Sequence, residues 1–220
     1  MSLQFNLTYD GKPLAMFERF AYPNGASVFI DRFNLFISEV NLVNATGKQA
    51  LKDVAWLDFT NLQDENTAKT GVKVEIPKVA LGTYNALQIG LGVSPALNAT
   101  TPSNYSASHP LANNYWEQWN SYISMVIEGK ADLTGGTKHD LVLTYHVGTD
   151  EAYSTILIED NFVIKTGSNT INLEIDLKKI LTKAEQHLDI EQYPRDHSTR
   201  PEVFDFLRLN LPNAVQLSKN

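Results

Sequence analysis

Cysteine is absent from this 220-residue chain, and basic residues are few. Without thiols there are no disulfides, thiolate metal sites or cysteine nucleophiles, so a transition-metal site must use histidine, carboxylate or aromatic side chains. The net charge is −7, and no Lys/Arg cluster offers a face for phosphate groups, which argues against a nucleic-acid partner. No apolar run approaches the roughly 18 residues of a membrane span. The start, MSLQFNLTYD, has neither the basic nor the apolar region of a signal peptide.

Signatures of common enzymes are also missing. The GLG at 90–92 is not followed by a crossover helix, so it is no dinucleotide fingerprint. Neither G-x-S-x-G nor H-E-x-x-H occurs. Several carboxylates fall in strand-like segments, where acidic residues on the wet face of a sheet are the simplest interpretation: Asp31, Glu39, Asp58, Glu75 and Glu128. We therefore expect a non-catalytic protein.

What the sequence has in abundance is alternation with period two, which is typical of half-buried β-strands. Phe33, Leu35 and Ile37 share one phase whereas Val40 and Leu42 share the other, so a bulge near Ser38 is expected. About ten short strands follow one another with turn residues between them and no intervening helices, which predicts an all-β fold, an antiparallel β-sandwich of the Greek-key or immunoglobulin-like kind. The expected strands lie at 3–9, 27–43, 54–60, 72–77, 84–93, 121–129, 139–148, 154–160, 162–167 and 170–176.

Helical periodicity appears only near the C-terminus. Residues 177–188 place apolar side chains on one stripe behind Asp176, a credible N-cap. Residues 201–212 begin with Pro201 at a first helical position and end at Pro212. We expect one or two short helices that cover an edge or open end of the sandwich. No repeat or linker divides the chain, so residues 1–220 are expected to form a single domain.

The longest irregular segment, residues 94–120, is the first candidate for function, because loops of that length in compact domains are more often functional than idle. It leads into HPLANNYWEQWNSYISMVIEG at 109–129, which contains two of the three tryptophans. Trp116 and Trp119 could pack at an edge of the sandwich or form an exposed platform that stacks on a sugar ring. The residue types alone do not choose between these two interpretations.

Five histidines are the remaining candidates for chemistry. His187 is most simply a residue at the helix boundary, and His139 a solvent-exposed turn residue. His146 ends a strand just before Gly148, where the loops of a sandwich converge, although a hydrogen-bonded structural histidine is the commoner case. His109 precedes a proline and is biased to extended backbone, from which it could reach across a cavity or face water. The same alternatives hold for His197.

Several segments in order resemble the MbnP-like domains, periplasmic or surface proteins of Gram-negative bacteria that are named after a copper-binding partner in methanobactin biology. Residues 109–129 resemble the core signature of the family. The family's Trp-x-Trp spacing is replaced here by Trp-x-x-Trp, and Ser121 stands where the family has Gly. The other similar segments are FNLFISEVNLV (33–43), GTYNALQIGLGVSPALN (82–98), LTYHVG (143–148) and HSTRPEVFDFLRLNLPNAV (197–215).

The resemblance implies a β-sandwich in the periplasm or at the cell surface, secreted or held by a lipid on a cysteine outside this sequence. Related proteins bind Cu(I) through two histidines and kynurenine, a tryptophan oxidised by a dihaem peroxidase-like partner enzyme. Carried over to this chain, His109 and His146 are the expected copper ligands, Trp116 is the first candidate for oxidation and Trp119 the second.

Three functions therefore remain as hypotheses. The first is a non-catalytic copper-binding protein of the cell envelope. The second is a carbohydrate-binding or adhesive sandwich with a stacking surface of Tyr105, Tyr115, Trp116 and Trp119. The third is an interaction domain without a small ligand. Convergence of His109 and His146 to within the reach of one metal ion would favour the first, and two parallel exposed indoles the second.

Overall fold

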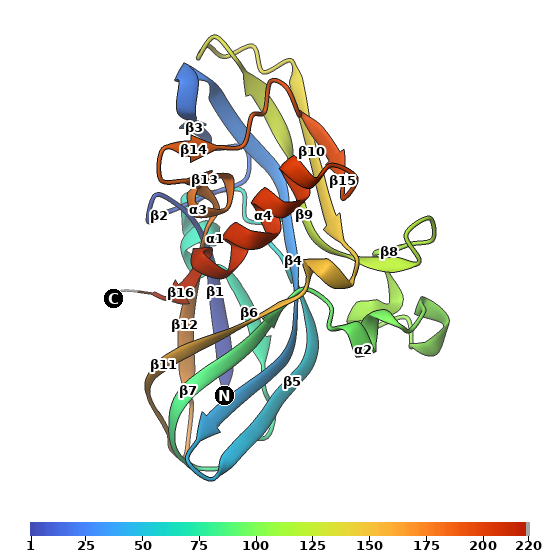
Figure 1. Ribbon diagram of the computed structural model, residues 1–220. Helices are drawn as coiled ribbons and strands as arrows, with labels where there is room; N and C mark the ends of the chain where they lie inside the picture. Colours follow the sequence, from blue (N-terminus) through green and yellow to red (C-terminus); the bar gives the residue numbers. More distant parts are fainter. Residues whose placement is uncertain (219–220) are drawn as a thin grey trace.

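The computed structural model describes residues 1–218 and arranges their strands in two facing sheets and a small hairpin (Figure 1). The first sheet has the order β16-β12-β1-β2, with β6 paired to β1. Its strands are β1 (Ser2–Tyr9), β2 (Lys12–Pro13), β6 (Val72–Glu75), β12 (Thr170–Asp176) and β16 (Val215–Leu217).

The second sheet has the order β11-β7-β4-β9-β10-β15, with β3 and β5 paired to β4 and β8 paired to β9. Its strands are β3 (Arg19–Ala21), β4 (Ser27–Asn44), β5 (Gly47–Asp58), β7 (Gly82–Leu91), β8 (Tyr115–Trp116), β9 (Ser121–Asp132), β10 (Leu141–Gly148), β11 (Ser154–Ile164) and β15 (Arg195–His197). The hairpin consists of β13 (Thr182–Lys183) and β14 (Gln186–His187).

The predicted β-sandwich is confirmed, and its main core lies between the two sheets. Phe5 and Leu7 on β1 are buried in the same apolar cluster as Leu35 and Ile37 on β4, because alternation in each strand sends every second side chain to the inner face. The predicted bulge near Ser38 is also present, since the register of β4 against β7 shifts between Ser38 and Asn41.

Two strand pairs depart from the expected antiparallel pattern. β1 pairs in parallel with β12 from Ser2 to Thr8, and β10 pairs in parallel with the short β15. The second of these pairs positions the candidate site described below.

Both expected helices are present, but α3 is shorter than expected and α4 is longer. Asp176 caps α3 (Leu177–Leu181) as predicted, since its carboxylate accepts from the backbone N–H of Lys178. The expected helix over 177–188 is wrong beyond residue 181, because the chain turns into the β13–β14 hairpin with Ala184 at φ 51°. α4 (Pro201–Ala214) begins at Pro201 as predicted but continues past Pro212. No helix within residues 1–218 is both long and apolar enough to span a membrane.

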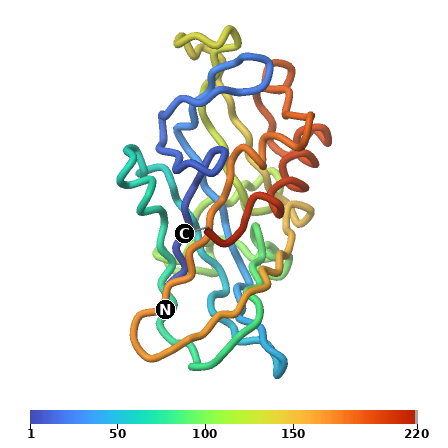
Figure 2. Tube along the Cα trace, turned by 90° about the vertical axis from the view of Figure 1, so that its left-hand side faces the viewer, coloured from blue at the N-terminus to red at the C-terminus, as the bar shows by residue number. Residues whose placement is uncertain are grey.

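The α-helix α1 (Glu65–Thr70) precedes β6. Residues 94–120 lie on the outer face of the second sheet and include α2 (Pro95–Asn98) and β8 (Figure 1). A separate apolar cluster anchors this segment, in which Leu111 is buried with Phe36, Val54, Val93 and Tyr122. The strands β1 and β16 lie on the side of the molecule away from it (Figures 1 and 2). The segment is therefore an ordered addition to the sandwich and not a loose loop.

Candidate metal centre

The candidate site lies on the outer face of the second sheet, where β8, β9, β10 and β15 meet (Figure 1). His146 on β10 and His197 on β15 are direct partners in the parallel pairing. Their imidazole rings stack with centroids 4.7 Å apart and planes 20° apart. Two histidines that are distant in the sequence are thus neighbours on adjacent strands.

Side-chain hydrogen bonds fix the backbone around both histidines. Ser198 donates from its hydroxyl to the carbonyl oxygen of His146 and accepts from the N–H of Gly148. The buried carboxylate of Asp196 accepts from the hydroxyl of Thr199 and from the N–H of Arg200. These contacts hold the turn that follows β15, and they position His197 against β10.

The two nitrogens of His146 have different surroundings. Nε2 lies 2.7 Å from Oε1 of Glu128 on β9, and because a carboxylate accepts, Nε2 carries the hydrogen. Nδ1 is buried and has no hydrogen-bond partner within the described residues. A buried imidazole nitrogen without a partner is costly, unless an additional group binds it.

The surroundings of His197 favour the neutral form of its imidazole. Burial lowers the pKa of its imidazole, and the neighbouring His146 lowers it further, against the opposing effect of Asp196 and Glu128. A neutral imidazole keeps a lone pair that is available to a metal ion. The neutral form of His197 therefore offers a nitrogen lone pair on a ring that stacks against His146.

Two stacked tryptophans cover the histidine pair. Trp116 on β8 meets His197 edge to face at 5.0 Å and His146 at 5.8 Å between ring centroids. Trp119 stacks on Trp116 at 4.9 Å with planes 15° apart, and its ring lies against Gly148. The altered Trp-x-x-Trp spacing thus forms a turn that brings both indoles to the same side.

His109 is not brought to His146. It stacks on Tyr105 at 4.2 Å with planes 6° apart, and its Nδ1 accepts from the N–H of Leu111. It lines a shallow pocket with residues 50–54 of β5, whereas His146 lies on β10, and β4 and β9 separate β5 from β10 in the sheet. The physical cause is the turn after Pro110, which buries Leu111 in the outer cluster.

The other two histidines are engaged elsewhere. His139 is buried rather than exposed, with Nε2 3.1 Å from the hydroxyl of Ser27. His187 lies 2.8 Å from the side-chain amide of Asn24. Among residues 1–218 there is no group of three or more His, Cys, Asp or Glu side chains arranged around one metal position.

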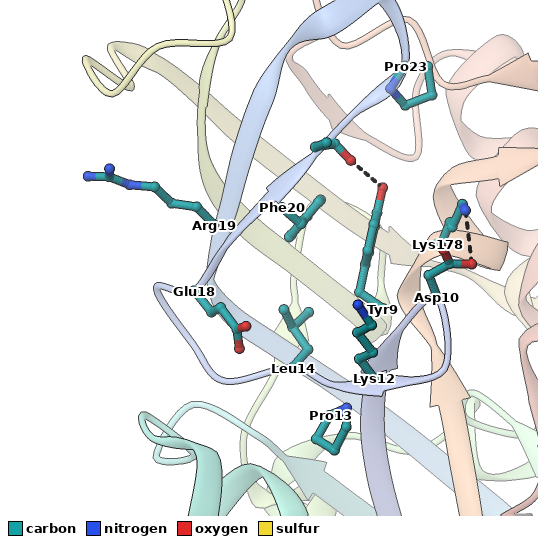
Figure 3. Close-up of a pocket in the computed structure, with 11 residues that line it drawn as sticks. Tyr9, Asp10, Lys12, Pro13, Leu14, Glu18, Arg19, Phe20, Pro23 and Lys178 are labelled. Carbon is teal, nitrogen blue, oxygen red and sulfur yellow. Dashed lines mark hydrogen bonds and ion pairs between the residues drawn. The ribbon is translucent and has the colours of Figure 1, made fainter.

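The structure also has a cleft of about 540 Å³ beside β2, β3 and α3 (Figure 3). Its aromatic wall is Tyr9 stacked on Phe20 at 4.0 Å, and its charged rim includes the 2.9 Å ion pair between Lys178 and Asp10. Burial, with Asp10 and Asp176 nearby, raises the pKa of Tyr9 to about 12, so its hydroxyl stays protonated and donates to the carbonyl of Ala21. These side chains satisfy one another, and the cleft shows no unpartnered buried group comparable to Nδ1 of His146.

Sequence reasoning did not assign His197 and Glu128 to the site. His197 lies in a three-residue strand, too short to leave a periodic signal. Glu128 alternates as a surface strand residue does, and only the cross-strand geometry places it beside His146. The strand register offers one signal for Glu128. Val126 is the direct partner of His146, and Glu128, two residues further along β9, is therefore a diagonal neighbour of His146 in the antiparallel pair.

The fold and the site define a β-sandwich with a histidine and tryptophan cluster on its outer face. The family model MbnP matches residues 1–199, and the chain belongs to the MbnP family. Among solved structures it is similar to MbnP from Methylosinus trichosporium, with 17% identity and a TM-score of 0.52 over 81% of this chain and 76% of that chain. At this identity the structural likeness shows the fold. No curated protein matches.

Proposed function

We propose that this MbnP-family protein is a non-catalytic binding protein that holds Cu(I) between His146 and His197, beneath Trp116. The observation that carries the proposal is the buried, unpartnered Nδ1 of His146, which lies beside a second histidine stacked at 4.7 Å. The resemblance implies two histidine ligands, and the pair in contact is His146 with His197, in place of the pair His109 and His146 expected from the sequence.

The donor set favours copper over zinc. Imidazole suits both metals, but structural zinc sites almost always take four protein ligands, and the chain has no cysteine to supply them. Glu128 is already engaged by His146 and Arg32. Two imidazoles leave a site of low coordination number, which is compatible with Cu(I).

Trp116 is the proposed position of oxidation, since it contacts both histidine rings whereas Trp119 contacts Trp116 and Gly148. Both indoles are half-buried, so an oxidising partner can reach them. The resemblance implies that this partner is a dihaem peroxidase-like enzyme and that the protein works in the periplasm or at the cell surface. We propose Trp119 as the second candidate.

The geometry of the tryptophans gives less support to a carbohydrate-binding platform. The two indoles are parallel, but they stack on one another, so each ring covers a face of the other. A sugar-binding platform needs ring faces that are free for the ligand. Tyr105 and Tyr115 do not extend this surface, because both pack against the outer apolar cluster.

Anaerobic Cu(I) titration against a competing chromophoric chelator tests the proposal. The wild-type protein is expected to bind one Cu(I) ion, and His146→Ala and His197→Ala are each expected to lose the tight site. His187→Ala is the matched control, because His187 is also half-buried but bonds to Asn24 outside the site. Wild-type affinity in both site variants would contradict the proposal.

A further inference from the structure

A row of polar side chains crosses the outer face of the second sheet and ends at His146. Asn34 on β4 donates to Asp58 on β5 at 2.7 Å and accepts from Arg32 at 2.6 Å. Arg32 donates to Oε1 of Glu128 at 3.4 Å, and the same oxygen accepts from His146 at 2.7 Å. The row thus links four strands, β5, β4, β9 and β10, through charged and amide groups.

The row restrains the side chain of Glu128 independently of its hydrogen bond to His146. Arg32 and Glu128 are direct partners between β4 and β9, and Asn34 restrains the guanidinium from its other side. The side chain of Glu128 is only 27% exposed and that of His146 only 13%, so few water molecules compete for the bond between them. The carboxylate therefore presents Oε1 to the imidazole in a defined orientation.

The bond decides which nitrogen of His146 is free. A neutral imidazole has one nitrogen that donates and one that accepts. In the neutral form of His146, with Nε2 donating to Glu128, the lone pair lies on Nδ1, the atom that is buried without a partner. His197 has no comparable carboxylate bond to its ring within residues 1–218, so the restraint applies to one of the two histidines only.

We propose that Glu128, held by Arg32, is a positioning residue that orients His146 so that Nδ1 is its copper-binding atom. The inference rests on the proposed copper function. Carboxylates that accept from the second nitrogen of a metal-bound histidine fix the ring and make it a stronger ligand, and their loss costs about 10- to 100-fold in metal affinity.

Silver(I) is the probe for the ligating atom, because it is a diamagnetic analogue of Cu(I) whose nuclei split the signal of a directly bonded nitrogen. Protein labelled with ¹⁵N-histidine is titrated with Ag(I) and followed by proton–nitrogen correlation spectra. We expect a silver splitting on Nδ1 of His146 and none on its Nε2. A splitting on Nε2 would overturn the inference while leaving the copper function intact. Splitting on no histidine would contradict the copper function itself.

Two substitutions of Glu128 test the positioning role. Glu128→Leu is expected to weaken Cu(I) binding about 10- to 100-fold, and Glu128→Gln, which keeps an acceptor oxygen, is expected to restore most of the affinity. In the metal-free protein the Nε2 hydrogen of His146 should give a protected signal in wild type and Glu128→Gln and exchange with water in Glu128→Leu.

Glu159→Leu is the control, since Glu159 is an exposed strand residue on β11. Glu128→Leu with wild-type affinity and a protected Nε2 hydrogen would overturn the inference. If Glu128→Leu does not fold, the Ag(I) spectra of wild type and the Glu128→Gln affinity still decide it.

Discussion

The imidazole of His146 lies flat against the imidazole of His197, with ring centroids 4.7 Å apart. Parallel pairing of β10 with β15 makes the two residues direct partners, and Ser198 ties the turn beyond His197 back to the carbonyl of His146. The contact is therefore built into the sheet and does not depend on a flexible loop. Because of this contact, His197 is the histidine that lies beside His146.

Substitution of His109 is expected to leave Cu(I) affinity unchanged. His109 bonds to the N–H of Leu111 and stacks on Tyr105, away from the His146–His197 pair. His109→Ala should therefore bind Cu(I) as wild type does in a chelator competition, whereas His197→Ala should not. Loss of binding in His109→Ala together with normal binding in His197→Ala would restore the ligand pair expected from the sequence.

Oxidation in protein isolated from its native host is expected on Trp116. Its ring contacts both histidines, whereas Trp56 packs against Phe36 in the outer apolar cluster. Fragmentation of the peptide that contains both Trp116 and Trp119 in a mass spectrometer should locate the mass change on Trp116. The matched control is recombinant protein made without the partner enzyme, which should carry unmodified tryptophan. Modification of Trp119 or of Trp56 in place of Trp116 would contradict the assignment.

The two sheets were predictable because their signal is repeated along many residues. The alternation in β1 and β4 repeats over whole strands, and burial of one face enforces it. The bulge after Ser38 was predictable for the same reason, since it reverses the phase of the apolar residues. Helix α3 was overestimated because its apolar stripe continues into 182–188, where the chain forms a hairpin instead.

The candidate site was only partly predictable. His146 could be singled out because it ends a strand, and the resemblance to the MbnP-like domains added Trp116. The partner of His146 could not, because the three-residue strand that carries His197 is defined by its pairing with β10 and not by its own sequence. His109 was preferred to His197 because the resemblance implied it, yet the turn at Pro110 buries Leu111 and places the histidine against Tyr105.

Gly148→Ala is expected to destabilise the protein and disturb the tryptophan stack. A Cβ atom at this position would lie 2.7 Å from the ring of Trp119 and 2.7 Å from the carbonyl oxygen of Tyr122. Such overpacking typically costs about 1–3 kcal/mol, which urea unfolding would measure.

The double variant Gly148→Ala/Trp119→Ala separates the two obstacles. Removing the indole should recover only part of the loss, since the backbone oxygen of Tyr122 remains. Stability of Gly148→Ala equal to that of wild type would show that both the turn carrying Trp119 and the backbone of β9 at Tyr122 move away at little cost, and that the stack is not held rigidly over β10.

Asp132 is expected to make the hairpin between β9 and β10 sensitive to acid. Hydrogen bonds from the Thr134 hydroxyl and from the N–H groups of Lys138 and Thr134 lower the pKa of the Asp132 carboxyl to about 2. Because the folded pKa lies below the unfolded one, this stabilisation is fully present above about pH 4 and is lost as the pH falls toward about 2.

Asp132→Asn should therefore be less stable than wild type at neutral pH, since its amide N–H₂ would face the N–H of Lys138. The difference in urea midpoint should shrink as the pH falls from about 4 to about 2. Asp140→Asn is the control, because Asp140 is exposed and its ion pair in residues 1–218 is with the side chain of Lys138 at 3.5 Å. A gap between wild type and Asp132→Asn that stays constant over this range would contradict the role of the charged carboxylate and leave only its shape as the source of stability.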